Sequence, residues 1–157
     1  MRIKSPRRPP ALILTLGCAA AALLATADVR RRRAEAGVPP EARLAALQRA
    51  AAEPGATADD WRAFARALSD AGRFGPGAQA WRRTLEMAPY DAEAADGLAV
   101  ALAESGDREA LMEYLEEYVT LDARTALLTL QRPALVRHAS DARYGRLLAE
   151  ARSQAVD

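Results

Sequence analysis

The chain is poor in the side chains that most often carry out chemistry in proteins. Among 157 residues it has one cysteine, Cys18, and one histidine, His138. A single cysteine cannot form a disulfide within the chain, and one histidine cannot complete a His-rich or Cys/His zinc site. Ser140 and Asp141 follow His138 too closely for the geometry of a Ser/His/Asp triad. We therefore expect no enzyme, no metal site and no bound cofactor.

Basic residues are outnumbered by acidic ones outside one region. The first 33 residues hold eight Lys/Arg and one Asp, whereas the remainder holds 14 Lys/Arg against 20 Asp/Glu. Nucleic-acid binding needs clustered basic side chains that displace the counterions of the phosphates. The one basic run, the four arginines at 30–33, directly follows an apolar segment, which is typical of a membrane-surface anchor. We therefore expect no nucleic-acid partner.

The only long apolar run is ALILTLGCAAAALLATA, residues 11–27, and it follows a basic N-terminus. Its 17 residues lie at the lower edge of the length that spans a bilayer. A cleaved secretory signal would have the same basic start, short apolar stretch and small-residue site at 25–27. An uncleaved anchor would have arginines beyond its far end; because arginines after a cleavage site oppose translocation, they favour the anchor. A slight excess of positive charge before the run predicts a cytoplasmic N-terminus and a body outside.

The rest of the chain resembles itself at a shift of 34 residues. This shift aligns Leu68 with Leu102, Gly72 with Gly106, and Trp81 with Leu115. In each unit, apolar residues at i and i+4 predict a first helix, a glycine suited to a left-handed turn follows it, and a second helix comes next. Each unit is therefore expected to be a helical hairpin.

Residues at the expected helix ends agree with this period. The stretch TADD, residues 57–60, has the form of a capping box, and Asp91 and Asp107 can cap the two helices that come after them. Pro76 is expected at a first helical position, and Pro89 is expected to end the second helix.

The period and the residues that recur in it resemble the tetratricopeptide repeat. The first unit, residues 58–91, has the family's pattern, and the second unit, residues 92–123, is a degenerate copy with Ala95 where tryptophan is usual. The matching residues of the first unit are Trp61, Phe64, Ala65, Leu68, Gly77, Trp81 and Pro89. Within this family, the region from DDWRAFARAL through APYDAEAADGLAVALAESGD is similar to bacterial cytochrome c biogenesis factors, which are membrane-tethered and hold apocytochrome or haem-ligation components. The resemblance implies a single-pass protein of the bacterial inner membrane with a periplasmic domain.

The expected fold class is all-α: an N-terminal transmembrane or signal helix, a short stack of repeat hairpins, and capping helices. The expected parts are a basic and apolar region at 1–33, a linker with a short helix at 34–56, two repeats at 57–123, and C-terminal helices at 124–157. Two repeats are fewer than a helical stack usually needs, so helices at 41–53, around 123–131 and from about 141 must cap them. Pro133 should break the chain between the last two. Tyr144, Leu147, Leu148 and Ala151 are expected on one face of the final helix.

In tetratricopeptide arrays the first helices of successive units line a concave groove, so the resemblance places a partner on their non-core face. The implied residues are Arg62, Arg66, Ser69 and Asp70 from the first unit, and Asp96, Val100 and Glu104 from the second. Arg62 and Arg66 can bind a carboxylate of a partner peptide, or they can pair with nearby Asp or Glu of the same surface. The predicted function is a membrane-anchored scaffold or assembly factor for a protein partner, in cytochrome c or other membrane-complex biogenesis. The alternative is a structural subunit of a membrane complex, held by its N-terminal helix.

Overall fold

The computed structural model describes residues 39–155, and every regular element within them is a helix. The all-α expectation is confirmed for this part of the chain. The chain divides after Pro39, and the second unit, Pro40–Asp157, is described here by itself. The apolar run at 11–27 and the arginines at 30–33 lie outside the described residues. No helix within 39–155 is long and apolar enough to cross a membrane. The helices are α2 (Pro40–Ala52), α3 (Ala58–Asp70), α4 (Phe74–Met87), α5 (Ala92–Ser105), α6 (Arg108–Leu121), α7 (Ala123–Leu130), α8 (Pro133–Val136) and α9 (Ala142–Gln154).

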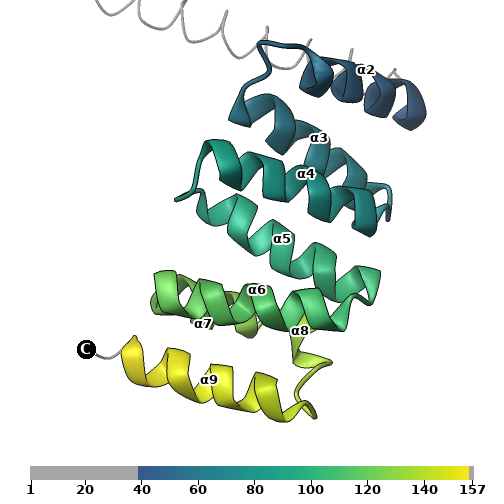
Figure 1. The fold of residues 1–157 in the computed structure, drawn as a ribbon. Helices are drawn as coiled ribbons and strands as arrows, with labels where there is room; N and C mark the ends of the chain where they lie inside the picture. Colours follow the sequence, from purple (N-terminus) through teal and green to yellow (C-terminus); the bar gives the residue numbers. More distant parts are fainter. Residues whose placement is uncertain (1–38, 156–157) are drawn as a thin grey trace, which may run out of the picture. The chain divides into compact units, whose positions relative to one another are not determined.

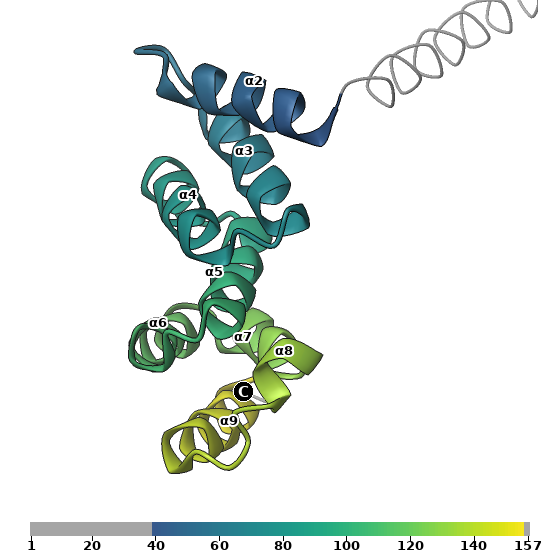
Figure 2. The same cartoon turned by 90° about the vertical axis from the view of Figure 1, so that its right-hand side faces the viewer.

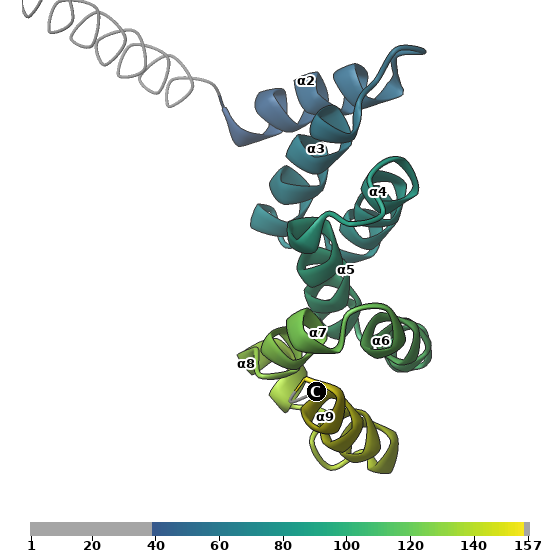
Figure 3. The ribbon, with the colours of Figure 1, turned by 90° about the vertical axis from the view of Figure 1, so that its left-hand side faces the viewer.

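The helices succeed one another as packed neighbours through the unit (Figure 1). α3 packs on α4 and α5 on α6, and each pair is joined by a short turn. α7 packs on α9 in the same way, with the short helix α8 inserted between them in sequence. α3, α5 and α7 form one layer, and α4, α6 and α9 form the other (Figures 2 and 3). α2 packs on α3 at the N-terminal end of the unit.

The residues expected at helix ends have their expected roles. The hydroxyl of Thr57 accepts from the Asp60 N–H, and the Asp60 carboxylate accepts from the Thr57 N–H at 2.8 Å. Asp91 and Asp107 each accept hydrogen bonds from amides in the first turn of the next helix. These carboxylates satisfy N–H groups that have no partner within the helix, which explains why α5 and α6 begin where they do.

The turns between paired helices depend on glycine. Gly72 and Gly106 have φ values of 70° and 80°, the left-handed region that other residues rarely adopt. α4 ends at Met87, two residues before Pro89, as expected. Pro76 is the third residue of α4 rather than the first, because the helix begins at Phe74. Its missing N–H still lies in the first turn, where no intrahelical hydrogen bond is lost.

The core runs through all the hairpins and includes Trp81. Its side chain is 3% exposed, and its indole N–H donates to Ser69 Oγ at 3.3 Å. The ring lies directly against the backbone of Gly97, where a Cβ atom would come within 2.5 Å of it. α4 and α5 can therefore approach closely only because residue 97 has no side chain.

The two ends of the stack are closed by helices near the expected positions. α2 buries Leu44 and Ala51. At the other end, α9 buries Tyr144, Leu147 and Ala151, and Leu148 is partly buried against the same core. The Tyr144 hydroxyl donates to the Leu130 carbonyl, which ties α9 to the end of α7. Pro133, expected only as a break, also begins α8, where its fixed φ suits a first helical position.

Candidate functional site

The two arginines predicted to bind a partner hold carboxylates of their own chain. Arg62 donates from Nε to Asp91 at 2.8 Å and also pairs with Asp59. Arg66 forms a bidentate ion pair with Glu93. These hydrogen bonds, above all those to Asp91 and Glu93, raise the pKa of each guanidinium against the opposing effect of burial. The structure therefore shows the alternative in which both arginines pair with nearby acidic residues.

The other predicted residues of α3 differ in orientation. The Ser69 hydroxyl donates to the Ala65 carbonyl at 3.0 Å and accepts from Trp81, so it belongs to the interior contact between α3 and α4. Asp70, the last residue of α3, is exposed. From this half of the predicted set, Asp70 and Arg66 are exposed, and Arg66 is paired with Glu93.

The predicted residues of α5 contact the C-terminal helices. Asp96 accepts from the Thr129 hydroxyl at 3.0 Å and from Arg132 at 2.7 Å, and Glu104 pairs with Arg137 at 2.7 Å. Val100, between them on α5, is partly buried against the core. α7 and α8 both pack on α5, so this face of α5 is covered by the chain itself (Figures 2 and 3). The seven predicted residues therefore do not share one open surface within residues 39–155, and partner binding by them stays a prediction.

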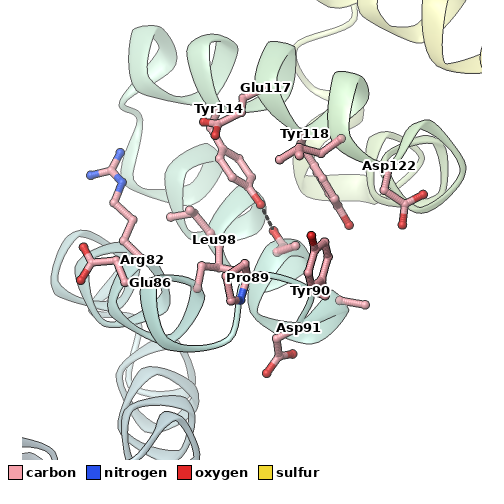
Figure 4. A pocket seen from close by; sticks show the side chains of 14 residues that line it. Arg82, Glu86, Pro89, Tyr90, Asp91, Leu98, Tyr114, Glu117, Tyr118 and Asp122 are labelled. Atoms are coloured by element: carbon pink, nitrogen blue, oxygen red, sulfur yellow. Dashed lines mark hydrogen bonds between the residues drawn. The ribbon is translucent and has the colours of Figure 1, made fainter.

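One opening in the described surface lies on the side of α5 that faces α4 and α6. It is a pocket of about 500 Å³ between the end of α4, the start of α5 and the end of α6, called here the α4–α6 pocket (Figure 4). Its lining comprises Arg82, Leu85, Glu86, Pro89, Tyr90, Asp91, Ala92, Ala95, Leu98, Tyr114, Glu117, Tyr118, Leu121 and Asp122. This volume falls within the range of about 300 to 1,000 Å³ that is common for ligand pockets.

Two tyrosines from successive turns of α6 form one wall of the α4–α6 pocket. The rings of Tyr114 and Tyr118 are stacked, with centroids 5.6 Å apart and an interplanar angle of 26°. The Tyr114 hydroxyl donates to the Ala95 carbonyl at 3.1 Å, as the dashed line in Figure 4 shows. Burial, reinforced by the nearby Tyr118, Glu117 and Asp96, raises the pKa of Tyr114, so this hydroxyl keeps its proton at neutral pH.

The hydroxyl of Tyr118 has no such partner. Its side chain is 6% exposed, and its oxygen is buried without a hydrogen bond among residues 39–155. Burial raises the pKa of this hydroxyl, and the nearby Thr129 offsets the rise only in part. The Thr129 hydroxyl donates its proton to Asp96, and its oxygen can still accept a proton from a neighbour. Tyr118 therefore keeps a buried, protonated hydroxyl next to Thr129.

The mouth of the α4–α6 pocket combines exposed apolar side chains with acidic ones. Tyr90, in the α4–α5 turn, is 96% exposed, and Leu121, at the end of α6, is 70% exposed. Tyr90 also borders a shallow neighbouring depression that includes Arg62 and Glu93, so one of the predicted arginines lies close to this pocket. The acidic side chains in the lining are Glu86, Asp91, Glu117 and Asp122.

Sequence reasoning missed the α4–α6 pocket because the repeat pattern directs attention to the first helices of each unit. The signals that it left unused are Tyr114 and Tyr118 at i and i+4 on α6, and an aromatic residue directly after Pro89 in a turn. Tyr114 and Tyr118 would be assigned to the core from periodicity alone, and both are in fact largely buried.

Within the described part of the chain, no three His, Cys, Asp or Glu side chains come together as metal ligands. Comparison with models of protein families, with curated proteins and with solved structures gives no match. Residues 40–154 form an all-helical unit of paired helices with an apolar pocket between α4, α5 and α6.

Proposed function

We propose that the protein is a scaffold or assembly factor of the tetratricopeptide kind that holds a segment of another protein next to a membrane. The 34-residue period coincides with two helical pairs, α3–α4 and α5–α6, each with a left-handed glycine in its internal turn. The pair α7–α9 extends the same two layers. These features support the repeat class.

The observation that carries the binding function is the α4–α6 pocket with Tyr90 and Leu121 exposed at its mouth. Concave apolar sites beside exposed large apolar side chains are typical of interaction surfaces. Tyr90 is held in a short turn between two rigid helices, so it can be buried by a partner at little cost in conformational entropy.

The membrane location in this proposal comes from the sequence. Residues 11–27 would anchor the protein in the bacterial inner membrane, with the helical unit in the periplasm. The narrower resemblance to cytochrome c biogenesis factors makes the assembly of a membrane complex, with cytochrome c maturation as one case, the proposed setting.

The test is the ratio in which the full chain and its partner are recovered from membranes. After brief chemical crosslinking in the cell and purification in mild detergent, an assembly factor should hold less than one partner per chain and release it without crosslinker. A partner recovered at a fixed ratio that survives detergent without crosslinking would instead establish the structural-subunit function.

A further inference from the structure

We propose that the α4–α6 pocket receives one large apolar side chain of an extended peptide segment that carries an arginine or lysine beside it. This inference rests on the proposed function and names the chemistry of its partner. It assigns the partner to the layer of α4 and α6, and not to the face of α3 and α5 that the family resemblance implies.

The size and lining of the α4–α6 pocket set the apolar part of the partner. Leu85, Leu98 and Tyr114 supply its walls, and about 500 Å³ is enough for a side chain of the size of leucine, phenylalanine or tryptophan. Tyr90 and Leu121 at the mouth would lose their exposure to water when a peptide covers them.

The two tyrosines of α6 present their rings, and not their hydroxyl groups, to a partner. Figure 4 shows the hydroxyl groups of Tyr114 and Tyr118 directed toward the start of α5, on the side where Tyr90 lies. The Tyr114 hydroxyl is bound to the Ala95 carbonyl, and the Tyr118 oxygen is buried. An inserted apolar side chain would therefore contact the aromatic rings of this wall.

The charges of the lining set the flanking residue of the partner. Asp91 is bound by Arg62, and Glu86 pairs with Arg83, so these two carboxylates are largely compensated. Glu117 forms no ion pair within residues 39–155. Asp122 caps α7, and its hydrogen bonds from Thr125 lower its pKa, so it is ionised at neutral pH.

Arg82 is the only cation in the lining. The remaining negative charge therefore attracts a cationic side chain and repels phosphate or an anionic lipid headgroup. A second copy of the chain is less suited, because two exposed apolar side chains are far fewer than a stable dimer face of about 800 Å² per partner contains.

The experiment begins with a random peptide library displayed on phage and selected against the full chain in detergent micelles. We expect enriched peptides to share a large apolar residue within two positions of an arginine or lysine. A fluorescein-labelled synthetic copy of the most enriched peptide then serves as the probe, and its Kd is measured by fluorescence anisotropy.

Two matched pairs of variants locate the site of that peptide. Ala92 and Ala142 are both exposed first residues of helices that begin after an aspartate cap, but only Ala92 lines the pocket. Ala92→Trp should weaken binding at least about tenfold by filling the mouth, and Ala142→Trp should leave it unchanged. Glu117 and Glu113 are both exposed and lie one turn apart on α6, but only Glu117 lines the pocket. Glu117→Lys should weaken binding about fivefold, more at low salt than at high salt, while Glu113→Lys should not.

The contrary outcomes separate this inference from the proposed function. Enriched peptides without a basic residue, no enriched peptide, or equal binding to wild type and Ala92→Trp would overturn the pocket assignment. A concentration-dependent dimer that Ala92→Trp disrupts would place a second copy there and overturn it as well. If the partner crosslinks in the cell equally to wild type and to Ala92→Trp, the scaffold function stands and only the pocket inference fails. If no partner crosslinks to wild type, the scaffold function itself fails.

Discussion

At the scale of single residues, the contact between Trp81 and Gly97 decides how closely α4 and α5 pack. The two positions are linked only through the fold, since they come from different helices and different repeats. In an isolated helix a central glycine is unfavourable relative to alanine, because it loses more backbone freedom on folding. Gly97 is therefore a position where tertiary packing outweighs helix propensity.

This contact predicts opposite effects for the same substitution at two helical glycines. Gly97→Ala should destabilise the protein by about 1 to 3 kcal/mol, because its Cβ atom would collide with the Trp81 ring. Gly145→Ala, in α9, should stabilise it by about 0.5 to 1 kcal/mol, because nothing lies within 4 Å of the added atom. Urea denaturation of both variants measures the two changes. A Gly97→Ala variant as stable as wild type would contradict the close packing of α4 and α5.

At the scale of elements, four helix starts depend on aspartate carboxylates whose pKa values are lowered. Asp60 is stabilised by its hydrogen bonds with Thr57, Asp122 by those with Thr125, and Asp141 by Arg108 and the Arg143 N–H. For Asp91, burial alone would raise the pKa, but hydrogen bonds from the Ala94 N–H and from Arg62 outweigh it. A carboxylate with a lowered pKa stabilises the fold above its unfolded pKa of about 4, and this contribution is lost as the pH falls through the folded value.

Asp91→Asn separates the charge of this residue from its role as a helix cap. Asparagine caps helices about as well as aspartate, but it cannot form the ion pair with Arg62. We expect the variant to be less stable than wild type by about 0.5 to 1 kcal/mol at pH 7. We also expect a smaller loss of stability between pH 5 and pH 3, because one titrating group is gone. Thermal unfolding midpoints across this range test both expectations, and an unchanged pH dependence would exclude a contribution from the Asp91 charge.

Sequence patterns predicted the helices far better than the contacts between them. The starts of α3, α5 and α6 depend on side chains within three residues of the helix, so Thr57, Asp91 and Asp107 reveal them directly. The cover that α7 and α8 place over Asp96 and Glu104 depends on Arg132 and Arg137, which lie more than 30 residues away. No local pattern specifies such a pairing. The groove was predicted from the geometry of the tetratricopeptide family. In the structure, Arg132 and Arg137 pair with Asp96 and Glu104, the predicted acidic groove residues of α5.

At the scale of the whole molecule, we expect the helical unit alone and the full chain, which includes the apolar run at 11–27, to behave differently. A chain starting at Ala34 should be soluble and helical by circular dichroism, because the helices of residues 40–154 form a compact unit. The full chain should stay in the membrane pellet after an alkaline wash. Release of the full chain by that wash, at its uncleaved mass, would contradict membrane anchoring by residues 11–27.

The nearest-neighbour packing of the helices also has a consequence for where the unit opens first. α2 packs mainly on α3, whereas α5 contacts α3, α4, α6, α7 and α8. Where helices pack mainly on their neighbours, the free energy of local opening is roughly the sum of the interfaces that are broken. Opening α2 breaks the smallest set of interfaces and therefore costs the least free energy. α2 can separate and return many times without disturbing α4, α5 and α6. A peptide bound between those three helices would therefore be held by the part of the unit that opens least often.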